Sequence, residues 1–198
     1  MSDLASSWDL IVVGAGPAGL AAASMAARAG LSTLLLDENP GVGGQIYRGI
    51  TANPVRNRAI LGDDYWAGTA LAAEAKASGA TIVNGATVWS LDRALGVGVS
   101  IAGKARLLQA RKVIVATGSL ERPFAIPGWT LPGVYGAGGL QALVKSGLPV
   151  KGKHVVVAGS GPLLLAVAAV LMVTIGRQFR RLSTSEASLT ATTLKLDT

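Results

Sequence analysis

Apolar residues along this chain gather in short, continuous runs that are separated by Ala-rich stretches of helical length. The runs rich in Val, Ile and Leu predict buried parallel strands, and the Ala-rich stretches between capping and glycine signals predict helices. Strands are predicted at 10–13, 32–37, 80–83, 112–116 and 154–158, and helices at 17–29, 64–78, 137–146 and 163–173. This alternation predicts an α/β fold with a doubly wound parallel sheet.

Three shorter runs interrupt the alternation before the strand at 112–116. They lie at 86–91, 97–101 and 105–110, and turn-like segments connect them. Short strands joined in this way are typical of a β-meander. We therefore expect a meander inserted into the parallel fold.

The first strand leads into the segment Gly14-Ala15-Gly16-Pro17-Ala18-Gly19. Gly14 allows a tight turn, Gly16 lets a pyrophosphate approach the main chain, and Gly19 lets the helix pack close to the strand. Pro17 suits the first helical position, where no N–H is needed. The helix N-terminus offers free N–H groups and a partial positive charge to phosphates. The segment predicts a dinucleotide-binding site.

An acid follows at the spacing that this signature requires. Asp37 ends the second predicted strand, with Glu38 next to it, and a carboxylate about 20 residues after the glycines bonds a ribose hydroxyl. The signature alone does not separate FAD from NAD, and NADP is less favoured because the acid repels a 2′-phosphate. A glycine-rich turn in an unrelated α/β protein is the alternative, but it leaves the position of Asp37 to chance.

The composition excludes several kinds of chemistry. Half of the 198 residues are hydrophobic, enough for a substantial core, and there is no cysteine, which removes disulfides, thiolate metal sites and thiol redox reactions. The single histidine, His154, precedes a strand, where a solvated residue is favoured over a catalyst, and histidine clusters for metals are excluded. Glu121 and Arg122 are expected to form a surface pair. We predict neither catalytic side chains nor a metal site.

The net charge is +7, but the basic residues have no interleaved aromatic residues and no nucleic-acid-binding motif. A solvated surface, or one that faces an acidic partner, explains them, and no nucleic-acid partner is expected.

The N-terminus has no basic region before the first strand, so we predict no signal peptide and a cytoplasmic protein. The uncharged run from Val155 to Gly176 is long enough for a membrane span. The turn Gly159-Ser160-Gly161-Pro162 interrupts it, and its first part is typical of a buried strand. Membrane association through this run is therefore kept only as an alternative.

Further segments resemble one family. They are Gly43-Gly44-Gln45-Ile46-Tyr47-Arg48, Ala116-Thr117-Gly118-Ser119-Leu120-Glu121-Arg122-Pro123, Gly128-Trp129-Thr130-Leu131-Pro132-Gly133-Val134 and Gly159-Ser160-Gly161-Pro162. Together with the first glycine motif they resemble the two-dinucleotide-binding-domain flavoproteins of the pyridine nucleotide-disulfide oxidoreductase type. Within these, the chain is most similar to the FAD/NAD(P)-binding subunits of opine oxidase, hydrogen cyanide synthase and hydroxyproline dehydrogenase.

The resemblance implies FAD as a cofactor and leaves NAD(P) open as a second one. The first motif and Asp37 would hold the pyrophosphate and ribose, and Gly44 and Gln45 would line the path to the flavin. Val88 would meet the adenine through its backbone, and Ala116, Thr117 and Gly118 would close over the cofactor. Gly159 and Gly161 would begin a second nucleotide site. The expected cofactor-binding residues are thus Gly14, Ala15, Gly16, Pro17, Ala18, Gly19, Asp37, Glu38, Gly44, Gln45, Val88, Ala116, Thr117, Gly118, Gly159 and Gly161.

The chain also departs from the family. The disulfide reductases place cysteines just after the Gly-Gly pair, and this chain has none, so thiol–disulfide exchange is excluded for these residues. In the second turn Leu164 stands where a third glycine would lie.

Past Val170 the resemblance ends. We expect an FAD-binding domain at 1–135 without its returning C-terminal segment, the start of an NAD(P)-binding-like domain at 136–175, and a disordered tail at 176–198. A truncated chain, such as a frame-shifted gene product, explains this pattern, and a short natural paralogue is the alternative.

The expected function is that of an FAD-dependent oxidoreductase subunit that oxidises a small amine or amino-acid-type substrate together with partner subunits. Two alternatives stay open, namely an inactive remnant that binds adenine nucleotides weakly and a membrane-associated protein that uses 155–176.

Overall fold

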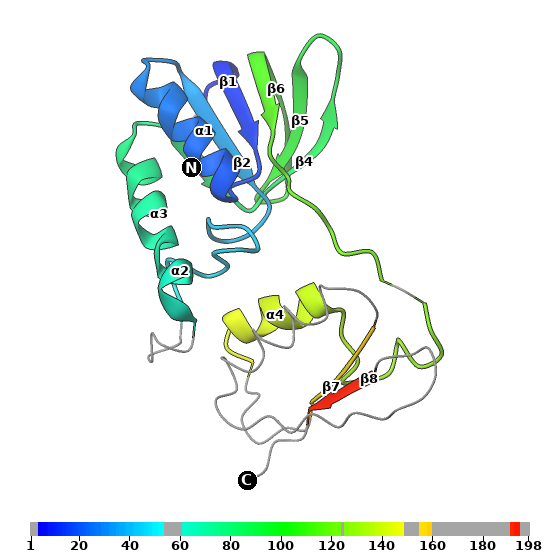
Figure 1. Cartoon of the computed structure of the whole chain (residues 1–198). Helices are drawn as coiled ribbons and strands as arrows, with labels where there is room; N and C mark the ends of the chain where they lie inside the picture. The colour runs from blue at the N-terminus through cyan, green and yellow to red at the C-terminus, as the bar shows by residue number, and fades with distance from the viewer. Residues whose placement is uncertain (1–3, 54–60, 124, 149–154, 160–190, 195–198) are drawn as a thin grey trace. The chain divides into compact units, whose positions relative to one another are not determined.

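The computed structural model describes residues 4–53, 61–123, 125–148, 155–159 and 191–194 (Figure 1). The chain divides into two compact units. The first comprises Met1–Asn53 and Asp63–Leu120, and the second comprises Pro54–Gly62 and Glu121–Thr198. The domain boundary at 135 stays a prediction.

The first unit is built on a mixed six-stranded sheet with the strand order β3-β2-β1-β6-β5-β4. Its strands are β1 (Ser7–Val13), β2 (Thr33–Asp37), β3 (Thr81–Asn84), β4 (Ala86–Leu91), β5 (Gly96–Ile101) and β6 (Lys104–Val115). The pairs β1–β2, β2–β3 and β1–β6 are parallel, whereas β4–β5 and β5–β6 are antiparallel. The predicted α/β class with an inserted meander is confirmed.

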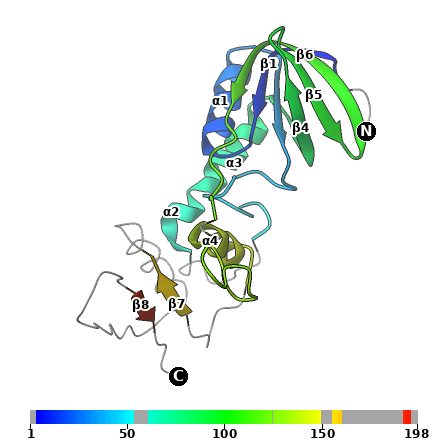
Figure 2. The ribbon, with the colours of Figure 1, turned by 90° about the vertical axis from the view of Figure 1, so that its right-hand side faces the viewer.

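The apolar runs of β1 and β2 are buried on both faces, as expected for parallel strands covered by two layers. Ile11, Leu34 and Leu36 face the meander and form one core with its buried residues, which include Val97 and Val99. Strand β4 also approaches β2, so the sheet curls over this core. The intervening residues of β1 and β2 lie on the opposite face, which helix α1 (Pro17–Arg28) covers, and α3 (Gly68–Ala77) packs against α1 (Figures 1 and 2).

One predicted helix is divided. Residues 64–78 form two helices, α2 (Gly62–Trp66) and α3, with Ala67 between them. A Cβ at Gly68 would overlap the ring of Tyr47. The helix is therefore interrupted next to a glycine that leaves room for this ring. The helix ends as predicted, because Ser78 is the C-cap and Gly79 has a positive φ of 91°.

The separate strands predicted at 105–110 and 112–116 are one continuous strand, β6. Gln109 pairs with Gly96 of β5 on one side and with Ser7 of β1 on the other. Since no glycine or proline lies between 104 and 115, the strand continues and changes partners at Gln109. The predicted break at Arg111, between the strands 105–110 and 112–116, was wrong.

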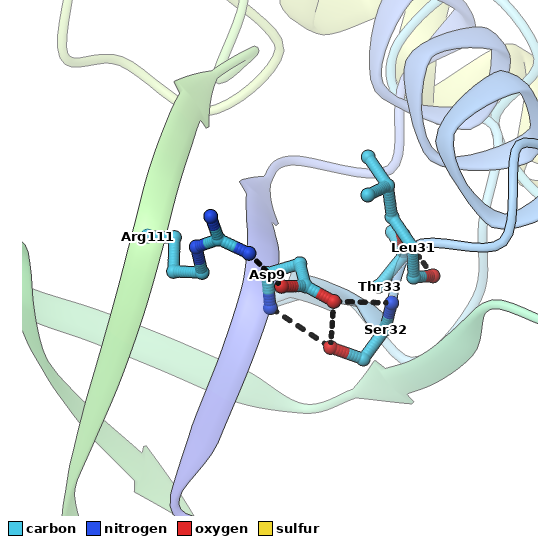
Figure 3. Close-up of polar contacts among 5 residues, drawn as sticks. All are labelled: Asp9, Leu31, Ser32, Thr33 and Arg111. Atoms are coloured by element: carbon cyan, nitrogen blue, oxygen red, sulfur yellow. Dashed lines mark hydrogen bonds and ion pairs between the residues drawn. The ribbon is translucent and has the colours of Figure 1, made fainter.

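At the amino end of the sheet the side chain of Asp9, on β1, contacts Ser32 just before β2 and Arg111 on β6 (Figure 3). Its Oδ2 accepts hydrogen bonds from the backbone N and the Oγ of Ser32, at 3.0 and 2.7 Å. Its Oδ1 lies 3.0 Å from Nη1 of Arg111 on β6. The hydrogen bonds from Ser32, aided by Arg111, hold the pKa of Asp9 below its ordinary value. The carboxylate thus fixes β1 between β2 and β6.

The second unit contains helix α4 (Ala137–Lys145) and the antiparallel pair of β7 (Val155–Ala158) and β8 (Ala191–Leu194). Within the segment 176–198, for which we predicted disorder, residues 191–194 form β8, a Thr-rich strand that pairs with the apolar β7. His154, Gly161, the predicted helix at 163–173 and the rest of the tail lie outside the described residues.

Candidate functional site

The glycine motif forms the turn between β1 and α1. Gly14 has a φ of 104° and donates from its N to the carbonyl oxygen of Leu36 at 2.7 Å. A Cβ at this position would overlap the carbonyl oxygen of Ala116, and Thr117 lies beside it. Any side chain would therefore be excluded both by the backbone conformation and by its neighbours. The structure brings Gly14, Ala116 and Thr117 together, and their role in closing over the cofactor stays a prediction.

Gly19 lies one turn into the helix and packs against the same turn. A Cβ there would overlap the carbonyl oxygen of Gly14, so only glycine lets α1 approach so closely. The predicted packing role of Gly19 is confirmed in geometry.

The N-terminus of α1 is open to an anion. Gly16 is the N-cap residue in an extended conformation, no side chain caps the helix, and Pro17 begins it. The first turn also carries no acidic residue, so the partial positive charge of the helix dipole is available to an anion.

A second glycine pair closes against this turn. Gly43 donates from its N to the carbonyl oxygen of Ala15 at 2.8 Å. A Cβ at Gly44 would lie 2.8 Å from the Cα of Gly16, whereas a Cβ at Gly16 would meet only Gly44, at 3.9 Å. The predicted site residues Gly16 and Gly44, distant in sequence, are thus in direct contact. Gln45 is exposed on the same loop.

Asp37 points back into the turn. Its Oδ2 accepts from the N of Ala15 at 2.5 Å, and its Oδ1 accepts from the N and Nδ2 of Asn39 at 2.7 and 2.9 Å. The residue is only 7% exposed. An ionised carboxylate has about four lone-pair sites, so roughly one remains for a ribose hydroxyl. Glu38, the neighbouring candidate, is exposed at the end of β2.

Asn39 is a residue that the sequence reasoning missed. Besides bonding Asp37, it accepts through its main-chain carbonyl oxygen from the N of Gly85 at 3.1 Å, next to the first meander strand. The main-chain bond from Asn39 to the side chain of Asp37 is an Asx turn that begins at Asp37, and a strand-ending Asp is its signal, which points to position 39 but not to an asparagine there.

The candidates Val88 and Thr117 share an apolar pocket of about 320 Å³. It lies between the meander strands β4 and β5 and the carboxyl ends of β1 and β6, and Val13, which precedes Gly14, also lines it. Gly118 follows Thr117 with a positive φ of 70°. Parallel strands end on this side, where ligands bind in open α/β sheets.

Gly159, the first residue of the second predicted nucleotide turn, directly follows β7. Because Gly161 is outside the described residues, this second site stays a prediction.

Glu121 does not pair with Arg122 as predicted. Its Oε2 accepts from the N of Gly138 at 3.0 Å and the N of Gly139 at 3.2 Å, so it caps α4. Free helical N–H groups attract the carboxylate more effectively than one solvated guanidinium does. In the part of the chain that the structure describes, no cluster of three or more His, Asp or Glu could hold a metal ion.

Comparison with known proteins decides the family. Residues 8–190 match the family described as pyridine nucleotide-disulphide oxidoreductase. The chain belongs to this family. Membership confirms the predicted family and its α/β fold, and FAD is the cofactor of this family. Because the chain has no cysteine, these residues lack the thiols that disulphide chemistry requires.

Three relatives illustrate the similarity. The opine oxidase A-type subunit of Agrobacterium tumefaciens (strain Ach5) is 46% identical over 179 residues, covering 86% of this chain and 36% of the relative. The HcnB subunit of hydrogen cyanide synthase from Pseudomonas protegens is 38% identical, covering 81% and 35%. The alpha subunit of sarcosine oxidase from Corynebacterium sp. (strain P-1) is 32% identical, covering 81% and 18%.

The chain therefore spans about a third of the length of the first two relatives. All three relatives are named as subunits. Within the described ranges, no helix has the length and apolar character needed to cross a bilayer. Most of the run at 155–176 lies outside those ranges.

Proposed function

We propose that this chain is the FAD-binding part of an oxidoreductase subunit that oxidises an amine or amino-acid-type substrate with partner subunits. The observation that supports it is the glycine turn whose amides and open helix end stand beside the buried carboxylate of Asp37. The names of the relatives, opine oxidase and sarcosine oxidase, support the substrate class, and their designation as subunits supports the partners. A cytoplasmic location and NAD(P) as a second cofactor are part of the same proposal.

The residues present fit a dinucleotide. Gly16 leaves its Cβ side open except for Gly44, so a diphosphate can approach the main chain there. The uncapped N-terminus of α1 offers N–H groups and a favourable dipole to the phosphate oxygens. Asp37 retains acceptor capacity for a ribose hydroxyl.

The chain's own part in the reaction is to bind and orient. Gly14, Gly16 and Gly19 would hold the diphosphate end, Asp37 the ribose, and Ala116 and Thr117 would close the turn from the β6 side. Bound flavin supplies the electron-accepting chemistry.

The experiment is a titration of the purified protein with FAD, followed by flavin absorbance and fluorescence, with Asp37→Ala as the variant. We expect saturable binding by the natural sequence and roughly tenfold to hundredfold weaker binding by the variant, since a hydrogen bond to a charged group contributes about 1.5–3 kcal/mol. Protein that is fully folded by circular dichroism and binds no FAD would contradict the proposal and favour an inactive remnant.

A further inference from the structure

A basic residue lies beside the glycine turn, in the loop that follows Gly43 and Gly44. Arg48 is half-buried there, and its backbone is fixed because its carbonyl oxygen accepts from the hydroxyl of Tyr65 at 2.8 Å. Tyr65 is itself buried on α2 and also accepts from Nδ2 of Asn53. The loop is therefore held at both ends, at Gly43 by Ala15 and at Arg48 by Tyr65.

The guanidinium of Arg48 is only partly satisfied. Its Nη1 lies 3.5 Å from Oδ1 of Asn39, a long contact for a hydrogen bond. Its Nε is buried and, in the described part of the chain, has no hydrogen-bond partner. A guanidinium carries five donors, and buried donors in native proteins are nearly always paired. The guanidinium of Arg48 therefore has N–H donors that the described residues do not bond well.

The position of Arg48 indicates what those donors meet. Asn39, which contacts Arg48, also donates from Nδ2 to Asp37, so Arg48 belongs to the network at the ribose acid. Within the described residues Arg48 makes no ion pair with a carboxylate. The loop carrying it touches the glycine turn where Gly44 meets Gly16. A cation that contacts this network from a loop touching the glycine turn is suited to bond a phosphate bound at that turn.

We propose that Arg48 is a cofactor-binding residue whose guanidinium bonds an oxygen of the diphosphate on its adenosine side. The first turn of α1 provides main-chain N–H groups but no charged side chain, since it begins Pro17-Ala18-Gly19. Arginine supplies the missing full charge and can bond phosphate through two donors at once. Asn39 then orients Asp37 and Arg48 together, with the carboxylate on the sugar and the cation on the phosphate.

The inference rests on the proposed function, and its test separates the two. Arg48→Met is titrated with ADP and with adenosine, and Arg93→Met, an exposed arginine at the meander turn, serves as the control of equal charge change. We expect Arg48→Met to weaken ADP binding roughly tenfold to hundredfold and to leave adenosine binding within about twofold. Arg93→Met should bind both ligands as the natural protein does.

Arg48→Lys covers the case in which the methionine variant does not fold. It keeps the charge but loses the planar fork, so ADP affinity should fall between those of the natural protein and Arg48→Met, with a steeper dependence on salt than the natural protein shows. Unchanged ADP binding by a folded Arg48 variant, or an equal loss for ADP and adenosine, would overturn the role of Arg48 alone. Failure of the natural protein to bind FAD or ADP would instead overturn the proposed function.

Discussion

Two aspartates join β1 to β2, one at each end of the sheet, and their surroundings differ. Asp9 at the amino end has a side chain that is 29% exposed and is paired with Ser32 and Arg111. Asp37 at the carboxyl end is 7% exposed and is bonded by backbone and amide N–H groups of Ala15 and Asn39. An aspartate carboxylate is thus paired with a cation at the amino end, whereas at the carboxyl end it is held by neutral N–H groups.

The difference shows which end is built for a ligand. At the amino end the carboxylate, the hydroxyl and the guanidinium satisfy one another, so the cluster only fixes the strands. At the carboxyl end the anion at Asp37, the cation at Arg48 and the uncapped helix do not neutralise each other directly. Unpaired charges of both signs around an open main chain suit a ligand with a sugar and a diphosphate.

The largest effect is expected where the carboxyl end is most tightly packed. Gly19→Ala would force a methyl group onto the carbonyl oxygen of Gly14, and overpacking of this kind costs about 3 kcal/mol. Urea unfolding measures the loss. Gly139→Ala in α4, where a Cβ meets nothing within 4 Å, is the control and should be neutral or stabilising by about 0.5–1 kcal/mol. Equal stability of the two variants would show that the close packing is not needed.

At the carboxyl end of the sheet, Gly16→Ala should change FAD binding without changing stability. A Cβ at Gly16 would meet only Gly44, at 3.9 Å, and φ is −71°, so the free energy of unfolding should change by less than about 0.5 kcal/mol. The methyl group would stand where a phosphate approaches, and we expect FAD affinity to fall roughly tenfold or more, about 1.4 kcal/mol. Flavin titration of the folded variant checks it, and unaltered affinity would place the diphosphate elsewhere.

The two helix N-termini extend the comparison, since α1 is uncapped whereas α4 is capped by Glu121. Glu121→Ala should release the N–H groups of Gly138 and Gly139 and cost about 1 kcal/mol, with faster hydrogen exchange at both amides. FAD affinity should stay the same, because the N-terminus of α4 is already bonded by Glu121 and is not part of the proposed FAD site. Unchanged exchange at Gly138 would mean that Glu121 is not the cap.

The smallest effect is expected at the amino end. Because the folded pKa of Asp9 lies below the ordinary value of 3.8, its stabilisation is present above that value and disappears as pH falls through the folded pKa. The natural protein should therefore exceed Asp9→Asn in thermal midpoint at neutral pH, by an amount that salt reduces. Midpoints measured down to acid pH check this, and a difference that grows on acidification would contradict it.

The sequence predicts the parts of this molecule that depend on local signals. Runs such as 10–13 are apolar throughout, and Gly14 and Gly19 occupy positions that tolerate no other residue for steric reasons. Asp37 follows from spacing alone. These features specify a strand, a turn and a helix without reference to distant residues.

The features that the sequence did not predict depend on contacts between distant segments. The continuity of β6 follows from Gln109 pairing with two strands at once, and Glu121 finds its helix in α4, well beyond its own neighbours. The role of Arg48 depends on Tyr65 holding its backbone. None of these contacts leaves a local pattern, whereas the turn that brings Asn39 to Asp37 does, because it is an Asx turn that begins at Asp37.

The proposed function requires that the carboxyl end of the sheet recognises the adenosine diphosphate half of FAD. Competition calorimetry with FAD, ADP and FMN is the decisive experiment, because FMN shares the flavin but lacks that half. We expect that FAD binds, that ADP displaces it, and that FMN neither binds tightly nor competes. Tight binding of FMN, or FAD binding that excess ADP leaves unaffected, would contradict this recognition.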